Sequence, residues 1–274
     1  MEKFLSDLHL HSFNSDGEAD YLDQIKRAKD LGLDAIALTD HDTLNGVKDF
    51  LHECKKNNLK AISGIELSCF DQTEIHILGY NVDPSKPSPL VKELANLSQA
   101  RKNRMIMIID KLKSLGVHIS YDEIIQKYKT NSVSRYHIAK LMVEKGYVKS
   151  KEEAYYLYLF PGKPAFVDFF YFDPFKAVEI IAKSGGTAVL AHPGRMRMDS
   201  LNLENLVKKL AEAGLKGIET YYPAHSKNAI KFFKQLAKKY NLINTNGSDT
   251  HNIYDNSITN FETEPKTIEV LGLR

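Results

Sequence analysis

Short apolar runs alternate with amphipathic stretches in the first eighty residues. FLSDLHL (4–10), AIALTD (35–40), AISGIEL (61–67) and EIHILGY (74–80) have the length and apolar content of strands. Stretches such as YLDQIKRAKDLG (21–32) repeat apolar residues at helical spacing and lie between the strands. This alternation predicts a parallel sheet or a (β/α) barrel.

The alternation stops at NVDPSKPSPL (81–90), where three prolines punctuate the chain. Beyond it the pattern is almost wholly helical and includes one long helix over 92–116, and strand–helix alternation returns afterwards. We therefore predict an α/β barrel built from residues 1–89 and 166–274. Residues 90–165 would form a helical insertion.

Charge and cysteine content exclude several classes of protein. Lys and Arg number 37 against 35 Asp and Glu, so a net charge of +2 does not indicate binding to long duplex nucleic acid or to a membrane. The two cysteines, Cys54 and Cys69, do not form a disulfide framework or a thiolate zinc site. The N-terminus is too short and too charged for a signal peptide. We expect a cytoplasmic protein.

At least six predicted strands place His, Asp or Glu at or near their carboxyl ends, which is the face that carries the active site in (β/α) barrels. A lone histidine such as His52 or His118 is more often structural. So many coincident strand ends favour a metal cluster, because burying unpaired ionisable groups is costly. These residues are His9, His11, Asp40, His41, Asp42, Glu66, His76, His192, Glu219, Asp249 and His251.

Nitrogen and carboxylate ligands without sulfur suit Mn, Fe or Zn. The candidate ligands outnumber what one ion holds, so we expect two or three divalent ions. One carboxylate would then bridge two of them.

Four segments carry a family resemblance: DLHLH (7–11), TDHD (39–42), AHPG (191–194) and GSDTH (247–251). With them the chain resembles the PHP (polymerase and histidinol phosphatase) superfamily of phosphoesterases. It looks most like the stand-alone branch that removes phosphate from nucleoside 3′,5′-bisphosphates or trims short oligonucleotides from the 5′ end. The insertion of that branch carries an R-x-H-I-A segment, which SRYHIAKLMVEKGYV (134–148) matches.

The resemblance implies a distorted (β/α)7-type barrel whose helical insertion selects the substrate. It implies hydrolysis of a small phosphorylated substrate, a nucleotide or short oligonucleotide, by attack of metal-bound hydroxide. Glu66, Asp249 and His192 are expected to act in catalysis. The implied ligands are His9, His11, Glu66 and Asp249 for one ion, Glu66, His76 and His192 for a second, and Asp16, His41 and His251 for a third.

Three aspartates, Asp7, Asp40 and Asp42, are expected to orient the imidazoles by accepting their other N–H. For Asp40 and Asp42, a cap on a helix starting near Thr43 is an equally good interpretation.

Basic residues are candidates for binding the rest of the substrate. Arg135 and His137 start an insertion helix, where a cation opposes the helix dipole, so anion binding is favoured there. Arg195 follows AHPG and Arg101 lies on the long helix, and for both a solvated surface role is the alternative. His225 would contact phosphate or protonate the leaving group, or would be a surface histidine.

Two other functions remain open from the sequence. One is histidinol-phosphate phosphatase, against which the SRYHIA insertion argues. The other is a non-catalytic metal-binding module, as PHP domains fused to DNA polymerases can be. Loss of ligands would mark such a module, and no ligand is lost here.

Overall fold

A computed structural model describes residues 3–128, 133–168, 172–252 and 259–273. The chain divides into two compact units. Residues 1–92 and 171–274 form the first, which we call the sheet unit, and residues 93–170 form the second, which we call the helical unit.

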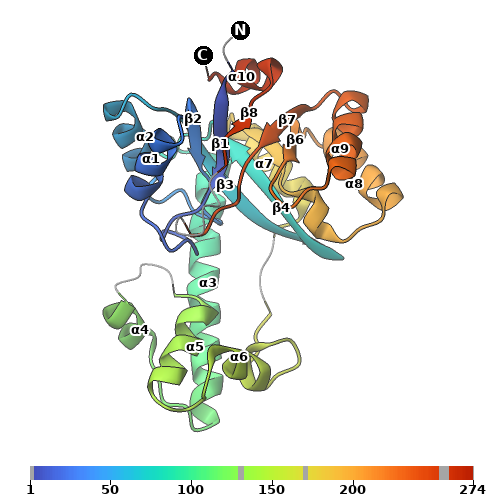
Figure 1. Cartoon of the computed structure of the whole chain (residues 1–274). Coiled ribbons are helices and arrows are strands. Elements are labelled where there is room, and N and C mark those ends of the chain that lie inside the picture. The colour runs from blue at the N-terminus through green and yellow to red at the C-terminus, as the bar shows by residue number, and fades with distance from the viewer. Residues whose placement is uncertain (1–2, 129–132, 169–171, 253–258, 274) are drawn as a thin grey trace. The chain divides into compact units, whose positions relative to one another are not determined.

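The sheet unit is built on one eight-stranded sheet with the order β7-β6-β5-β4-β3-β2-β1-β8 (Figure 1). Neighbouring strands are parallel from β1 to β3 and from β5 to β7, whereas β4 is antiparallel to both β3 and β5, and β8 to β1. The strands are β1 Leu5–Leu10, β2 Ala35–Leu38, β3 Lys60–Asp71, β4 Thr73–Tyr80, β5 Thr187–Leu190, β6 Gly217–Tyr221, β7 Ile243–Asn246 and β8 Phe261–Glu262.

The sheet nearly closes on itself, because Ser6 in β1 donates a hydrogen bond to Asn246 in β7 at 3.0 Å. Buried apolar side chains from strands on both sides of this closure, among them Leu8, Val189 and Ile243, fill the interior. Tyr80 crosses that interior, and its hydroxyl donates to the Leu8 carbonyl at 2.9 Å. The prediction of an α/β barrel is therefore confirmed.

Amphipathic helices cover the outside of the sheet and bury one face each (Figure 1). In α1, Asp20 caps the first turn by accepting from the Leu22 N–H, and Ile25 and Ala28 face the core. The helices of this unit are α1 Tyr21–Asp30, α2 Val47–Lys56, α7 Pro174–Lys183, α8 Ser200–Glu212, α9 Lys227–Lys239 and α10 Pro265–Leu271, with the 3₁₀ turn η2 at Pro193–Met196.

The helical unit has its own apolar core, in which Ile108, Leu112, Ile138 and Leu141 are fully buried. None of the described helices, α3 included, is long and apolar enough to cross a membrane. The helices are α3 Pro89–Ser114, which starts in the sheet unit, α4 Tyr121–Tyr128, α5 Arg135–Glu144, α6 Lys151–Ala154 and the π-helical turn η1 Tyr155–Leu159.

Candidate metal centre

The first strand delivers two histidines to one point. His9 and His11 alternate with Leu8 and Leu10, so both rings leave the backbone on the same side. Both are fully buried, and their Nε2 atoms lie 3.1 Å apart. Two ring nitrogens this close point at a shared ligand position.

Glu66 and Asp249 complete a set of four ligand atoms around that position. Glu66 Oε2 lies 3.3 Å from His9 Nε2 and 3.2 Å from His11 Nε2. Asp249 Oδ1 lies 3.5 Å and 3.1 Å from the same two nitrogens. Four ligands placed tetrahedrally at normal metal–ligand distances stand about 3.3 Å apart. The four atoms therefore fit a single ion.

Glu66 also faces a second group of histidines. Its Oε1 lies 2.9 Å from His76 Nδ1 and 3.0 Å from His192 Nε2, while its Oε2 lies 3.2 Å from His41 Nδ1. The carboxylate is fully buried between the two groups. One side chain thus presents an oxygen to each of two ligand sets, which is the arrangement of a bridging carboxylate.

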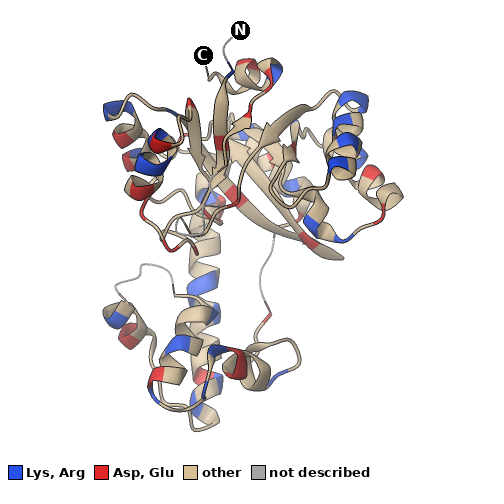
Figure 2. Ribbon diagram, in the orientation of Figure 1, with Lys and Arg blue, Asp and Glu red and all other residues tan. Residues whose placement is uncertain are grey.

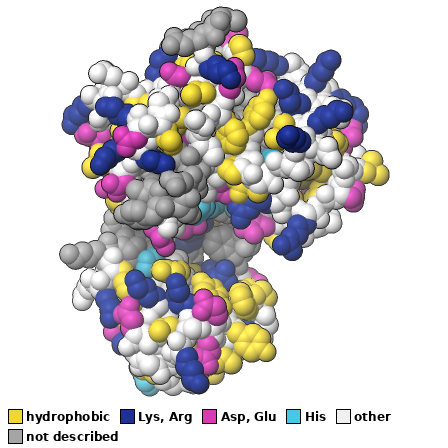
Figure 3. Space-filling view, in the orientation of Figure 1, with side chains coloured by type: hydrophobic (Ala, Val, Ile, Leu, Met, Phe, Trp, Pro, Cys, Tyr) yellow, Lys and Arg dark blue, Asp and Glu magenta, His cyan; other side chains and the backbone are white. Residues whose placement is uncertain are grey.

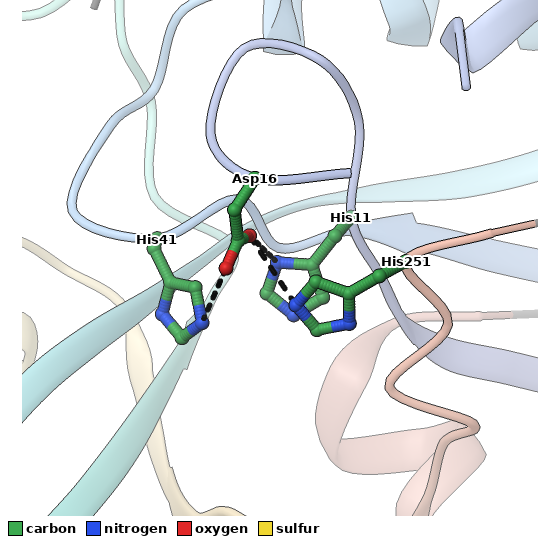
Figure 4. Close-up of side chains that lie close together, drawn as sticks. All are labelled: His11, Asp16, His41 and His251. Carbon is green, nitrogen blue, oxygen red and sulfur yellow. Dashed lines mark ion pairs between the residues drawn. The ribbon is translucent and has the colours of Figure 1, made fainter. Parts of the chain in front are cut away.

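A third group gathers around Asp16 (Figure 4). Asp16 Oδ1 lies 3.2 Å from His251 Nε2 and 3.7 Å from His11 Nδ1, and Oδ2 lies 3.8 Å from His41 Nε2. His11 was expected in the first group alone, but its other ring nitrogen faces this one. The structure brings together all nine of the expected ligands.

Several buried atoms of this cluster make no hydrogen bond to any described residue: His11 Nδ1, His41 Nδ1, Glu66 Oε2 and His192 Nδ1. Leaving such polar atoms buried without a partner costs free energy. Divalent ions would supply the missing partners, and an all-nitrogen and oxygen ligand set suits them. The residues present therefore fit a metal centre.

Comparison with known proteins identifies the family. A family model described as the PHP domain matches residues 7–249. The chain belongs to the PHP domain family. It is 32% identical over 247 residues to a 3′,5′-nucleoside bisphosphate phosphatase from Chromobacterium violaceum, which covers 89% of this chain and 86% of that protein. It is also 32% identical over 246 residues to a 5′-3′ exoribonuclease from Haemophilus influenzae, covering 89% of each.

A solved structure of an amidohydrolase from Chromobacterium violaceum, with bound sulfate and no metal, is similar with a TM-score of 0.78. The match is 30% identical and covers 95% of this chain and 92% of that one. The predictions of PHP membership, of the barrel fold and of phosphoester hydrolysis are thus confirmed.

Carboxylates raise the pKa of three buried histidines of the PHP centre. Burial alone would lower the pKa of His9, but the charges of the surrounding carboxylates outweigh it and raise that pKa well above its usual value. Burial alone would lower the pKa of His11, but the nearby carboxylates of Asp249 and Glu66 outweigh it and raise the pKa to about 9. Burial likewise opposes protonation of His76, and the charge and hydrogen bond of Glu66 raise its pKa to about 10. Without a bound metal, all three rings would therefore carry a proton near neutral pH.

Asp7 holds a loop of the PHP centre. Its Oδ1 accepts from the Ser248 N–H at 2.9 Å and its Oδ2 from the Thr259 N–H at 3.0 Å. The structure does not show the expected hydrogen bond to an imidazole, because main-chain N–H groups are the donors that contact the Asp7 carboxylate. Asp7 thus fixes the backbone that carries Asp249.

Asp40 also supports a loop that carries a candidate ligand. Its two oxygens accept from the Ser12 N–H and hydroxyl at 2.7 Å and from the Ser15 hydroxyl at 2.6 Å, so it shapes the loop that carries Asp16. Asp42 accepts from the Ser68 N–H at 2.8 Å. The capping interpretation for both is wrong, because α2 starts at Val47 and its N-cap is a glycine.

Glu219 is the residue whose role the sequence did not reveal. The sequence predicted a carboxylate at the end of a strand, but it did not indicate which residues Glu219 would contact. The structure shows that it is fully buried, with Oε1 accepting from His9 Nδ1–H at 2.9 Å and Oε2 from the His192 N–H at 2.7 Å. A Cβ at Gly247 would lie 2.5 Å from Glu219 Oε1, so this position needs glycine. One carboxylate orients ligands of two groups.

Arg195 reaches the centre from η2. Its Nη1 donates to Asp249 Oδ2 at 2.6 Å, and the hydroxyl of Tyr222 donates to the same oxygen at 3.4 Å. The Arg195 side chain is 55% exposed, so its guanidinium meets solvent as well as Asp249. This places a cation at the edge of the cluster.

His225 contacts main chain through both ring nitrogens. Its Nδ1–H donates to the Thr220 carbonyl at 3.0 Å, which leaves Nε2 to accept from the Gly194 N–H at 3.2 Å. Burial lowers its pKa. The structure therefore gives His225 a positioning role for the turn that carries Arg195, and protonation of the leaving group finds no support in it.

The remaining candidates belong to the helical unit. Arg101 lies on α3. Arg135 Nη1 donates to the Leu159 carbonyl at 3.4 Å, within the unit. His137 Nδ1 accepts from the Ser134 N–H at 3.2 Å and so caps the start of α5. Arg135 and His137 therefore each contact the main chain of the helical unit through a hydrogen bond.

Metal loading of the PHP protein should release protons, because His9, His11 and His76 hold protons that a metal must displace. All three pKa values are raised above 6.5, so release is full near pH 7 and declines as the pH rises toward 9. We expect about three protons per molecule near pH 7. Titration calorimetry in buffers of different ionisation enthalpy measures the number. A His76→Asn variant should release about one fewer, and a release that does not depend on pH would contradict the assignment.

Loss of Glu219 should weaken metal binding. Glu219→Ala removes both hydrogen bonds and is expected to lower affinity about 10- to 100-fold, and Glu219→Gln, which keeps one carbonyl acceptor, by less. Equilibrium dialysis against Mn measures this without catalysis. Glu179→Ala, at an exposed site on α7, is the control. Wild-type affinity in Glu219→Ala would show that His9 and His192 need no such support.

Proposed function

We propose that this PHP enzyme hydrolyses phosphate esters of a small nucleotide, either a nucleoside 3′,5′-bisphosphate or the 5′ end of a short oligonucleotide. The observation that carries the proposal is the buried Glu66 carboxylate, which faces a different set of ligands with each oxygen. The names of the relatives support a nucleotide as substrate. Histidinol phosphate is the less favoured alternative.

Two or three divalent ions, Mn, Fe or Zn, would occupy the centre. When bound, they activate a water molecule near neutral pH and offset the negative charge of the phosphoryl group. Glu66 would be shared between the first and second sites. The proposed ligands are His9, His11, Glu66 and Asp249 for the first ion, Glu66, His76 and His192 for the second, and Asp16, His41 and His251 for the third.

The chain's own residues position the ligands and offer a contact for the substrate. Glu219 holds His9 and His192, and Asp40 shapes the loop of Asp16. Arg195 would turn from Asp249 to the substrate phosphate, since a guanidinium matches two phosphate oxygens at once. Asp249 would then be released from Arg195 and would bind metal together with His9 and His11.

A non-catalytic module is disfavoured because the ligand set is complete and converges. The insertion's role in choosing the substrate, with Arg101, Arg135 and His137, stays a prediction. The cytoplasmic location also stays a prediction.

A substrate comparison with Mn tests the proposal. Adenosine 3′,5′-bisphosphate and a short 5′-phosphorylated oligonucleotide should be turned over with a kcat/KM at least about tenfold above that of histidinol phosphate, because a second phosphate adds a charge-assisted contact. AMP, with one phosphate, should have a kcat/KM between that of adenosine 3′,5′-bisphosphate and that of histidinol phosphate. Glu66→Gln, tested in parallel, shows whether the turnover belongs to this centre. Preference for histidinol phosphate would overturn the proposed substrate.

A further inference from the structure

Helix α9 differs in charge from the other helices. It carries five lysines, Lys227, Lys231, Lys234, Lys238 and Lys239, all exposed, and no acidic residue. Among the described helices of eight or more residues, each of the others contains at least one Asp or Glu. Figure 2 shows blue Lys and Arg positions concentrated along this helix, and Figure 3 shows basic side chains on the same part of the sheet unit. The concentration is local, since the whole chain has a net charge of only +2.

Four of these lysines form a row on one face. Lys227, Lys231, Lys234 and Lys238 follow at spacings of four, three and four residues, so they lie above one another along the helix. The row, which we call the lysine ladder, is about 16 Å long at the rise of an α-helix. It borders a surface pocket of about 740 Å³ whose apolar lining comes from Ile230, Ala237 and Leu242, and whose rim also includes Lys266.

The ladder starts at the end of the barrel that carries the metal centre. Tyr222, five residues before Lys227, places its hydroxyl 3.4 Å from Asp249 Oδ2. From Lys227 the helix packs back along β6 and ends near Leu242, just ahead of β7. Lys227 therefore lies at the carboxyl end of the strands, with the ligands, and Lys238 toward the opposite end of the barrel.

Charge in the ladder is only partly compensated. Lys234 contacts Glu264 at 3.3 Å and the hydroxyl of Tyr221 at 3.1 Å. Lys227, Lys231 and Lys238 have no ion pair or side-chain hydrogen bond with any residue in the described part of the chain. Three uncompensated cations in a row attract a ligand with repeated negative charges.

We propose that the lysine ladder binds the phosphates of a single-stranded oligonucleotide beyond the nucleotide held at the metal centre. A basic row tracks a nucleic-acid backbone, and an apolar pocket beside it accepts a base. The site deepens the proposed function and rests on it for the substrate class. A nucleoside bisphosphate is too short to follow the ladder, so the ladder gives the enzyme a preference for longer substrates.

The test uses a triple variant, Lys227→Ala, Lys231→Ala and Lys238→Ala, in the full-length protein with Mn. Alanine favours helix, so α9 is expected to form. Lys26→Ala, Lys48→Ala and Lys55→Ala, at exposed sites on α1 and α2, make the matched control with the same change in charge.

For a 5′-phosphorylated oligonucleotide of about ten residues, the ladder variant should lose about tenfold in kcat/KM, and for adenosine 3′,5′-bisphosphate less than about twofold. Binding of a fluorescent oligonucleotide to the metal-free protein is measured by anisotropy across a salt series. The slope of log affinity against log salt should decrease by about 2, which corresponds to three lost contacts with a single strand.

Unchanged oligonucleotide binding in the ladder variant would overturn the inference, as would equal losses in the control variant. Competition by polyglutamate as strong as that by the oligonucleotide would also overturn it, because the surface would then bind any polyanion. Failure of the wild-type protein to hydrolyse either nucleotide would count against the proposed function, and the anisotropy measurement would still test the ladder by itself.

Discussion

The buried carboxylate of Glu66 is the constraint on which the rest of the site depends. It has no access to solvent, and its oxygens lie within 3.3 Å of five imidazoles. A carboxylate buried in that way needs positive charge next to it. In the metal-free protein protonated histidines provide it, and in the proposed holoenzyme divalent ions do so. The same group therefore couples metal binding, protonation and the shape of the site.

Everything around Glu66 serves to keep the ligands in place. Asp7, Asp40 and Glu219 are buried carboxylates that accept hydrogen bonds from the backbone or a ring of the segments carrying the ligands. Backbone strain accompanies this: His192 and Asp249 adopt positive φ values of 23° and 58°. Non-glycine residues occupy that region at a cost, and such strain concentrates at functional sites. Main-chain and carboxylate contacts of the barrel thus fix the positions of the ligands.

Much of the site could be predicted from the sequence because its ligands lie at strand ends, and strand ends converge at one face of a barrel. His9, His11, Glu66 and His192 followed from that rule and from the family resemblance. Helix boundaries were less accurate: α3 begins at Pro89, because proline is favoured in the first turn. The β3–β4 pair is an antiparallel hairpin, which differs from the parallel order that the alternation of strands and helices predicted.

Contacts that depend on three-dimensional packing could not be predicted. Asp7 and Asp40 are next to ligands in the sequence, yet their oxygens meet main-chain donors from loops that only the closed barrel brings near. Glu219 contacts His9 across 210 positions in the chain. His225 was a candidate for contacting phosphate or protonating the leaving group, with a surface histidine as the alternative, but both its nitrogens contact the backbone. Each of these roles depends on the partner rather than on the residue type.

Anomalous X-ray scattering from crystals of the Mn-loaded protein tests the central claim most directly. The account predicts at least two Mn peaks, with Glu66 bonded to one of them through each oxygen, and with His9 and His11 on one side and His76 and His192 on the other. A single peak at full occupancy, or peaks that leave Glu66 uncoordinated, would contradict the claim that this carboxylate is the shared ligand of the centre.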